Sequence, residues 1–209
     1  MRHGQVHNPD GVLYGRLEGF GLSELGHQMA AEMADYWADV PLTHLRSSPL
    51  QRAQETIAPT AERFPELDVV IDDRVIEADN VFEGHVFGVD NKALRNPRML
   101  RHVLNPFRPS WGEAYVDIAA RMKAAIADAA KDAGPGGQAL IVSHQLSIWI
   151  ARCDAEGKRF AHDPRRRECT LTSVTSFTMR DGEVTAVDYC EPVAHLLPKK
   201  KGRKFRVGT

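Results

Sequence analysis

The sequence predicts an α/β fold, with three α/β/α layers around a mostly parallel central sheet. Two observations lead to this prediction. Apolar segments with strand-like patterning alternate along the chain with segments whose apolar residues recur at helical spacing, and this alternation is typical of a parallel sheet covered by helices. In addition, polar side chains that are capable of chemistry follow several strand segments directly, where ligands bind in such sheets.

The first part of the chain predicts two helices around a strand. Residues 22–37 carry apolar side chains every three or four positions behind Ser23, a favourable N-cap residue. Residues 42–47 predict a short strand. Pro49 suits the first turn of the helix that follows, and Pro59 should end or kink that helix.

The rest of the chain continues the alternation. Residues 113–133 form an alanine-rich helical segment that closes on the glycine-rich stretch 134–137. Asp181-Gly182 between two apolar segments is a strong hairpin signal. The remaining strands are expected at residues 69–71, 140–142, 171–179 and 184–189.

Length and composition fit a single domain at residues 1–197 with a sizeable core. No apolar run is as long as a membrane span and no signal peptide is recognisable, so we expect a cytoplasmic protein with no membrane partner. The three cysteines are odd in number and widely spaced, which disfavours a disulfide framework or a zinc site. The sequence leaves the oligomeric state open.

The net charge of −1 conceals an asymmetry. Six of the 27 basic residues lie among the last eleven; without them, 21 basic side chains face 28 acidic ones, so the body is near −7. We interpret residues 198–209 as a basic, disordered tail. Nucleic-acid binding through this tail is a disfavoured alternative, and it would appear as a steep dependence of affinity on salt.

The chain opens with the tripeptide Arg2-His3-Gly4. Histidine can act as a nucleophile that forms a covalent intermediate. The planar donor fork of arginine matches a phosphate, and glycine lets the backbone approach a ligand closely. A terminal tripeptide is a weak signal by itself, since terminal residues are usually frayed, so the interpretation depends on matching motifs downstream.

Four such motifs follow in order. They are the block Ser-Ser-Pro-Leu-Gln-Arg-Ala-Gln-Glu-Thr at 47–56, Val-Ile-Glu at 75–77, Glu-Gly at 83–84, and Leu-Ile-Val-Ser-His-Gln at 140–145. Together with the opening tripeptide, they make the chain resemble the histidine phosphatase superfamily, the phosphoglycerate-mutase-like proteins. The resemblance runs from Arg2 to about Cys190 and points to the phosphatase branch of that family.

The resemblance implies a catalytic site for phosphoryl transfer. Arg2 and Arg52 would supply forked donors to the phosphoryl oxygens, and His144 would add a further donor. His3 would attack phosphorus and hold the group as a phosphohistidine. Glu77 would protonate the leaving oxygen and later take a proton from the attacking water. Because arginines and imidazoles would supply the positive charge, we expect no metal and no cofactor.

Further residues are candidates for binding phosphate or substrate. Asn8 and Arg16 lie in the loop after the opening tripeptide, where Arg16 is either a contact for a second anionic group of the substrate or a surface residue. Gln145 stands where many relatives have glycine. Glu83 is the alternative acid, and the order of motifs in the family favours Glu77 instead. Residues 78–112 form an irregular insertion, which in the family covers the pocket.

The sequence therefore predicts a metal-independent phosphomonoesterase whose partner is a small-molecule phosphate ester. Mutase-type phosphoryl transfer is disfavoured, because residues 78–82 lack the Arg-His-Tyr-Gly run of the family's mutases. A non-catalytic phospholigand binder is a third alternative. The basic cluster at 162–167 is either a solvated loop or a patch that steers phosphate.

Family members carry a central strand immediately before the Arg-His-Gly motif, and it is missing upstream of Arg2. We therefore expect His3 to hang from an unanchored terminus. Loss of a central strand removes ladder hydrogen bonds and a buried apolar face, so a chain extended upstream is expected to be more stable and more active.

Overall fold

The structure, a computed structural model, describes residues 1–86 and 112–197. Its central sheet is parallel with the order β2-β1-β3, formed by β1 (Leu42–Ser47), β2 (Val69–Ile71) and β3 (Gln138–Val142). Leu45 of β1 lies beside Val69 on one side and Leu140 on the other. The three strands end together, so the residues that follow them meet at one edge of the sheet.

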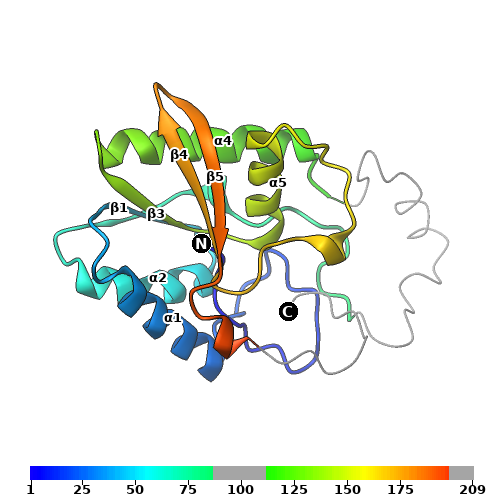
Figure 1. Ribbon diagram of the computed structural model, residues 1–209. Helices are drawn as coiled ribbons and strands as arrows, with labels where there is room; N and C mark the ends of the chain where they lie inside the picture. The colour runs from blue at the N-terminus through cyan, green and yellow to red at the C-terminus, as the bar shows by residue number, and fades with distance from the viewer. Residues whose placement is uncertain (87–111, 198–209) are drawn as a thin grey trace.

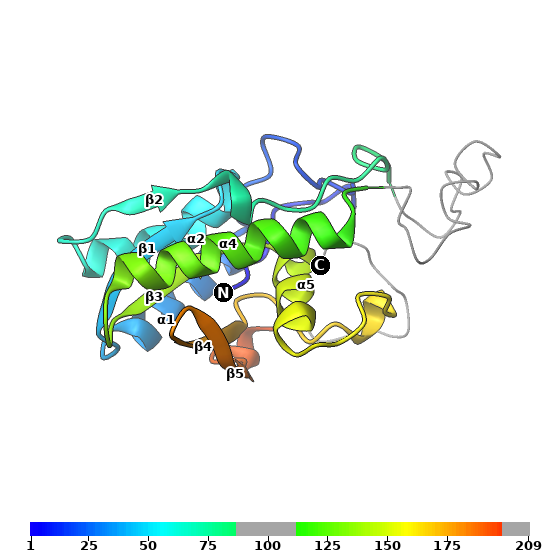
Figure 2. The ribbon, with the colours of Figure 1, turned by 90° about the horizontal axis from the view of Figure 1, so that it is seen from above.

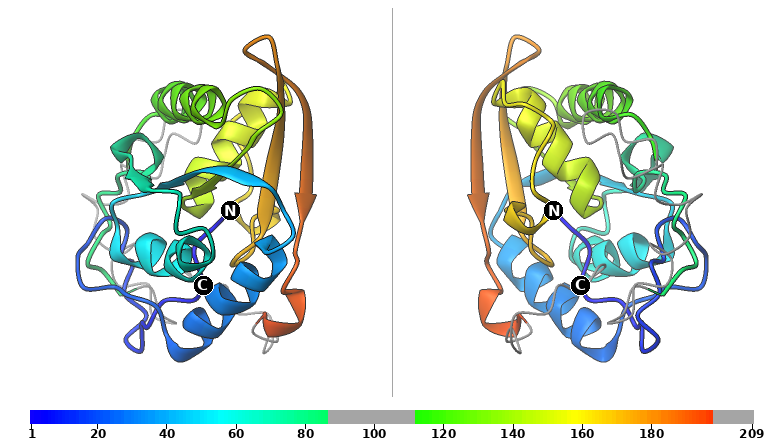
Figure 3. Two further views of the ribbon diagram at one scale, coloured as in Figure 1. Left: turned by 90° about the vertical axis from the view of Figure 1, so that its left-hand side faces the viewer. Right: turned by 90° about the vertical axis from the view of Figure 1, so that its right-hand side faces the viewer.

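Helices cover both faces of this sheet, as Figures 1 and 3 show. One face carries α1 (Glu24–Trp37) and α2 (Gln51–Arg63), and the other carries α4 (Tyr115–Ala133) and α5 (Gln145–Ala155). Two clusters of buried apolar side chains fill the spaces between the layers. The predicted three-layer α/β fold with a parallel central sheet is confirmed.

The first helix forms for the reasons that its sequence suggests. Ser23 is the N-cap residue, and its hydroxyl oxygen accepts the N–H of Gly26 at 3.1 Å. Met29, Met33 and Trp37 are buried on one face of α1, at the spacing that places residues four apart above one another. The predicted helix and its cap are confirmed.

The proline within α2 does not end the helix. The helix begins at Gln51, two residues after Pro49, and runs past Pro59 to Arg63. Ile57 beside Pro59 is buried in the apolar cluster under the sheet. Packing of this face offsets the lost hydrogen bond and the ring clash, which together cost about 3 kcal/mol in a helix interior. Of the two predicted outcomes at Pro59, the end of the helix is therefore wrong, and a kink stays a prediction.

A hairpin lies alongside the parallel sheet, beyond β3 (Figure 2). Its strands, β4 (Val174–Arg180) and β5 (Glu183–Cys190), pair antiparallel as predicted. Asp181 and Gly182 at the turn both have positive φ values, 52° and 81°, as a tight two-residue hairpin turn requires. Three short 3-10 helices complete the described residues: η1 (Asp73–Val75), η3 (Pro164–Arg166) and η4 (Ala194–Leu196).

The N-terminal residues lie inside the fold, between the end of β3 and the segment that precedes β4 (Figure 1). The amino group of Met1 donates to the carbonyl oxygen of Ile141 at 2.7 Å. The N–H of His3 donates to Ser143 at 3.1 Å, and on the other side its carbonyl oxygen accepts the N–H of Thr172 at 3.4 Å. The expectation of an unanchored His3 is therefore wrong, because backbone hydrogen bonds hold the N-terminal strip, residues 1–5, from both sides.

Two predicted segments fall largely outside the described residues. Most of the insertion at 78–112, namely 87–111, and the whole tail at 198–209 belong to the undescribed part of the chain. Within the described ranges, no helix combines the length and the apolar character that crossing a membrane requires.

Candidate functional site

Two histidines meet where the strands end. His3 lies in the N-terminal strip, and His144 comes two residues after the end of β3. Their ring centroids lie 5.2 Å apart, with the ring planes tilted by 55°. His3 is 2 % exposed and His144 is fully buried. Both imidazoles therefore share one site from which bulk water is largely excluded.

Hydrogen bonding fixes the tautomer of His3. Nδ1 lies 2.7 Å from the carbonyl oxygen of Gly4, and since a carbonyl can only accept, Nδ1 carries the proton. The lone pair of the neutral ring is then on Nε2. Burial lowers the pKa of His3 well below its usual 6.5, and the positive charges of Arg52 and Arg2 lower it further. His3 is thus a neutral imidazole with its basic nitrogen at Nε2.

A serine orients His144. Its Nε2 lies 2.7 Å from Ser48 Oγ, and the same oxygen accepts the N–H of Leu50 at 3.3 Å. Donation of the Ser48 hydroxyl proton to Nε2 favours the tautomer with its proton on Nδ1. That Nδ1 is buried and has no hydrogen-bond partner among the residues that the structure describes. Burial lowers the pKa of His144 well below its usual value, and the charge of Arg52 adds to the shift.

Two arginines flank the histidines, and both are buried without a carboxylate partner among the described residues. Arg2 donates from Nη1 to the carbonyl oxygen of Cys169 at 2.9 Å. Arg52 donates from Nη2 to Gly15 at 2.7 Å and stacks over the Tyr14 ring, 4.7 Å from its centroid. The Nε of each arginine is buried with no hydrogen-bond partner. Because a buried charge without a counter-ion is costly, these guanidinium groups favour binding of an anion.

Close backbone packing sets the position of His3. The N–H of Gly4 donates to Thr56 Oγ1 at 3.0 Å, and Thr56 Oγ1 donates to the carbonyl oxygen of Arg52 at 2.6 Å. A Cβ atom on Gly4 would lie 2.8 Å from the backbone oxygen of Gly26 in α1. The third residue of the opening motif is therefore glycine because the N-terminal strip passes directly against the first turn of a helix.

Glu77 lies in the loop after η1 and is half-buried. Its Oε1 accepts the N–H of Ala78 at 2.9 Å. Burial lowers the pKa of Arg52, and the negative charge of Glu77 acts against that shift, so the carboxylate lies within electrostatic reach of the guanidinium. A carboxyl group thus lies near one of the two arginines that flank the histidine pair.

A set of ionic side chains holds the backbone around Glu77. Arg121 of α4 donates from Nη1 to the carbonyl oxygen of Ile76 at 2.9 Å. Arg16 donates from Nε to the carbonyl oxygen of Glu77 at 2.8 Å. Glu113 pairs with both arginines, at 2.7 Å from Arg121 Nε and 3.0 Å from Arg16 Nη2. Arg16 therefore contacts protein groups, and its role in substrate binding stays a prediction.

Two other predicted residues are engaged in loop contacts. The amide of Asn8 closes its own loop, since Oδ1 accepts the N–H of Val12 at 3.0 Å and Nδ2 donates to the carbonyl oxygen of Val12 at 2.8 Å. Glu83 accepts the N–H of Arg16 at 2.9 Å. The structure thus gathers Arg2, His3, Arg52, Glu77 and His144, whereas the amide of Asn8 serves the loop beside them.

Comparison with known proteins decides the family. Residues 1–192 match the family model of the histidine phosphatase superfamily, branch 1. The chain belongs to the histidine phosphatase superfamily. The predicted resemblance is therefore confirmed over almost all of the described chain.

Individual relatives extend this result. The Mycobacterium tuberculosis protein Rv0525 is 50% identical over 194 residues, which span 93% of this chain and 95% of that protein. The mycobacterial glucosyl-3-phosphoglycerate phosphatase Rv2419c is 27% identical with a TM-score of 0.62, over 77% of this chain and 79% of that one. YhfR of Bacillus stearothermophilus, 23% identical over 88% of this chain and 91% of its own, shares the fold with a TM-score of 0.72. Family and neighbours support a phosphatase or phosphoryl-transfer enzyme.

In this histidine phosphatase family member, sequence reasoning assigned no role to three polar residues beside the site. Ser48 belongs to a quoted motif, but its contact with His144 depends on two distant strands meeting. Arg121 lies on a helix and gives no local sign of its contact with the Glu77 loop. Arg167 belongs to the basic cluster at 162–167, and its Nη1 lies 3.4 Å from Gln145 Oε1. Of these three residues, only Arg167 lies in a segment whose basic charge stands out in the sequence, and that charge did not indicate a specific role.

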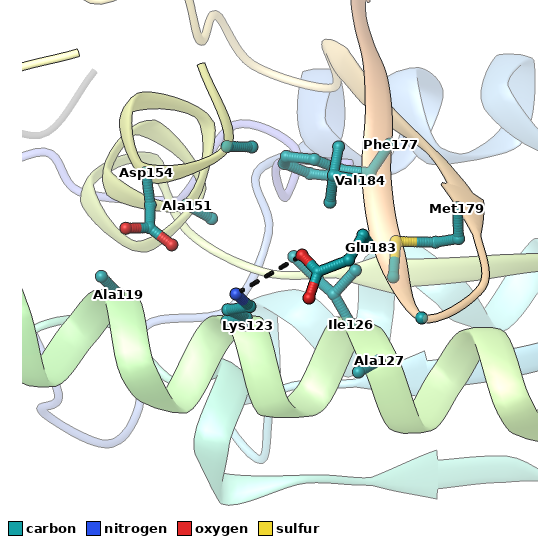
Figure 4. A pocket seen from close by; sticks show the side chains of 12 residues that line it. Ala119, Lys123, Ile126, Ala127, Ala151, Asp154, Phe177, Met179, Glu183 and Val184 are labelled. Carbon is teal, nitrogen blue, oxygen red and sulfur yellow. Dashed lines mark ion pairs between the residues drawn. The ribbon is translucent and has the colours of Figure 1, made fainter. Parts of the chain in front are cut away.

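A hollow of about 130 Å³ lies between α4, α5 and the hairpin of this histidine phosphatase family member (Figure 4). Lys123 of α4 faces Glu183 of β5 across it, with Nζ and Oε2 3.8 Å apart. None of the predicted site residues lines this hollow.

Among the residues that the structure describes, no three His, Cys, Asp or Glu side chains group together as ligands for a metal ion.

Proposed function

We propose that the protein is a metal-independent phosphomonoesterase that hydrolyses a small phosphate ester through a phosphohistidine on His3. The observation that carries the proposal is a neutral, buried imidazole with its lone pair at Nε2, beside two buried arginines that have no carboxylate partner in the described part of the chain. This is a nucleophile placed in an anion site. The mycobacterial phosphatase Rv2419c, which removes phosphate in the same family, agrees with this chemistry.

In the first step, His3 Nε2 attacks phosphorus while the bond between phosphorus and the ester oxygen breaks. Glu77 in its protonated form gives its proton to the leaving oxygen, so the product departs as a neutral alcohol. The phosphoryl group then resides on Nε2. The proton stays on Nδ1, which donates it in a hydrogen bond to the carbonyl oxygen of Gly4, and this bond stabilises the positive charge that develops on the ring.

In the second step, water attacks the phosphorus of the phosphohistidine. Glu77, now a carboxylate, takes a proton from that water. The bond between phosphorus and Nε2 breaks, and inorganic phosphate and neutral His3 are regenerated. The carboxyl group thus returns to its starting protonation state, and no proton is gained or lost by the protein over one turnover.

The arginines and His144 stabilise the charge on the phosphoryl oxygens during both steps. Within residues 1–86 and 112–197, the buried Nε–H groups of Arg2 and Arg52 and the Nδ1 of His144 have no hydrogen-bond partner. Donors fixed in a site poor in water stabilise developing charge strongly, because they do not have to reorganise during the reaction. A metal ion is not needed to neutralise the phosphoryl group when two guanidinium groups do so.

The test is hydrolysis of 4-nitrophenyl phosphate with EDTA present, by the wild-type chain and by His3→Ala. We expect turnover by the wild type and a loss of about 10⁴-fold or more in the variant, which is typical of removing a nucleophile. His7→Ala is the matched control, because His7 lies four residues away and is exposed.

A second readout follows the intermediate. Rapid quenching with labelled phosphate ester should trap an acid-labile, base-stable label on the wild type and none on His3→Ala. If EDTA abolished turnover, or if His3→Ala retained activity, the proposed mechanism would be wrong.

A further inference from the structure

One arginine outside the predicted site shares an unusual property with Arg2 and Arg52. Among the described residues, the other arginines that are at least partly buried pair with carboxylates; they are Arg16, Arg46, Arg74, Arg121 and Arg152. Arg167 is half-buried and forms no ion pair with any described residue. A partly desolvated guanidinium group without a counter-ion is costly, so Arg167 resembles the two phosphate-site arginines in lacking an anion that a ligand would supply.

Arg167 is joined to the phosphate site through Gln145. Nε2 of Gln145 donates to the carbonyl oxygen of Cys169 at 3.2 Å, and Arg2 donates to that same oxygen at 2.9 Å. Oε1 of Gln145 accepts from Arg167 Nη1 at 3.4 Å. The amide of Gln145 therefore bridges the two arginines, and Arg167 lies one side chain away from the predicted phosphoryl pocket.

The guanidinium of Arg167 is held by a neutral histidine. Its Nε donates to His162 Nε2 at 2.8 Å, while His162 Nδ1 donates to the carbonyl oxygen of Phe160 at 2.5 Å. The His162 ring packs against Trp149 and Tyr115, with centroids 5.6 and 5.9 Å away. Nη2 of Arg167 makes no hydrogen bond to any described residue. The side chain is thus fixed at one edge and retains donors for a ligand at the other.

Arg167 lies within electrostatic reach of the proposed proton donor, Glu77. Burial lowers the pKa of Arg167, and Glu77 is the strongest of the negative charges that act against that shift. Glu77 is the group proposed to protonate the leaving oxygen. Because the Gln145 amide separates Arg167 from Arg2, Arg167 is better suited to contact the part of the substrate that leaves than the phosphoryl group that is transferred.

We infer that Arg167, together with Gln145, forms a second anion subsite that binds an anionic group on the leaving alcohol. The substrate class is then a phosphate monoester with a second negative group, such as a carboxylate. This inference rests on the proposed function, because it names the substrate class of the same site. The guanidinium fork supplies the donors, and the Gln145 amide between Arg2 and Arg167 limits which esters are long enough to reach both arginines.

The test compares esters that differ only in the second anion. One pair is 3-phosphoglycerate and glycerol 3-phosphate, and a longer pair is 4-carboxyphenyl phosphate and phenyl phosphate. We expect Arg167→Met to lower kcat/KM by about 10- to 100-fold for the carboxylated member of at least one pair, the loss expected for a charge-assisted hydrogen bond. For the member of the pair without the carboxylate, kcat/KM should change by less than about threefold. Arg167→Lys, which keeps the charge and loses the fork, should lie between.

Arg166→Met is the matched control. Arg166 is adjacent, exposed and free of ion pairs among the described residues, so its variant carries the same change in net charge and should leave both members of each pair unaffected. Arg167→Met should also leave the melting temperature unchanged or raised, because it removes an unpaired charge. A purely structural role for Arg167 would instead lower the melting temperature and reduce turnover of every ester alike.

Binding measurements separate this inference from the proposed function. Calorimetry with propylphosphonate and 3-phosphonopropanoate needs no hydrolysis, and Arg167→Met should weaken binding of the second alone. If no ester were hydrolysed but this difference persisted, the proposed function would fail and the subsite would stand. If Arg167→Met lowered kcat/KM equally for both members of every pair, Arg167 would act on the transferred phosphoryl group and the inference would be wrong. If kcat/KM fell for no ester, the inference would also be wrong.

Discussion

His3 and His144 face one another with ring centroids 5.2 Å apart, and neither ring is paired with a carboxylate among the described residues. Many histidines that take part in catalysis are oriented by an acidic partner, which raises their basicity. Here a carbonyl oxygen orients His3 and a serine hydroxyl orients His144. The arrangement keeps both rings neutral, so the positive charge of the site comes from Arg2 and Arg52.

The first prediction concerns stability and pH. Burial, with the neighbouring arginines, lowers the pKa of both His3 and His144 below 6.5. Well above pH 6.5, both rings are neutral in the folded chain and in the unfolded chain. Below it, the unfolded chain binds protons that the folded chain does not, so the free energy of unfolding decreases as the pH falls. Each ring contributes at most about 1.4 kcal/mol per pH unit.

Denaturant unfolding between pH 5 and 8 measures this dependence. His144→Gln removes one of the two rings, so its free energy of unfolding should vary less steeply with pH than that of the wild type. The exposed His27 offers a control, because His27→Gln should run parallel to the wild type. Parallel curves for His144→Gln and the wild type would show that His144 does not stay neutral in the folded state.

The second prediction isolates the serine that orients His144. Ser48→Ala removes the partner of His144 Nε2, so the ring loses its fixed tautomer, and we expect kcat to fall by about tenfold or more. Ser47→Ala is the control: Ser47 is equally buried, but its hydroxyl donates to the backbone oxygen of Ser48 and not to a histidine. Steady-state kinetics of both variants decides the matter, and equal effects would mean that only local packing was disturbed.

Much of the architecture was predictable because it depends on neighbours in sequence. The cap at Ser23, the strand at Leu42–Ser47 and the turn at Asp181-Gly182 all follow from local preferences. The helix does not end at Pro59, because packing of the buried face of α2 outweighs the local preference. Helix α5 was not predicted at all, since it follows His144 with few local start signals.

The site was predictable only where a motif names the residue. His3, Arg52 and His144 belong to such motifs, but their surroundings depend on contacts across the whole chain. His3 is held by Ser143, 140 residues away in sequence, and nothing near the terminus indicates that contact. Arg167 likewise becomes meaningful only when the fold places Gln145 beside it.

The third prediction tests the close contact between the N-terminal strip and α1. A Cβ atom on Gly26 would lie 2.0 Å from the backbone oxygen of Gln5, two residues after His3. Alanine normally stabilises a helix relative to glycine, but here Gly26→Ala should destabilise the fold by about 1–3 kcal/mol through overpacking and displace His3. Thermal unfolding and turnover measure both effects. His27→Ala, at the exposed next position, should change neither, and a Gly26→Ala variant as stable as the wild type would contradict the packing argument.

The fourth prediction tests whether Arg121 positions Glu77. Arg121 binds the carbonyl oxygen of Ile76 and shares Glu113 with Arg16, which binds the carbonyl oxygen of Glu77. Arg121→Gln should let this loop move, so the proposed proton donor is held less accurately. An acid matters most when the leaving group is a poor one. We therefore expect kcat to fall by about tenfold for an alkyl phosphate and by much less for 4-nitrophenyl phosphate, whose leaving group needs little protonation.

The comparison of leaving groups distinguishes positioning from general damage to the fold. Lys123→Gln is the control on the same helix, because Lys123 is exposed and its ion pair with Glu183 is a long one of 3.8 Å. Glu77→Gln should reproduce the leaving-group dependence of Arg121→Gln in stronger form, since it removes the proton itself. An equal fall for both esters in Arg121→Gln would mean that Arg121 supports the site as a whole, and that the link from Arg121 to Glu77 is not what sets the rate.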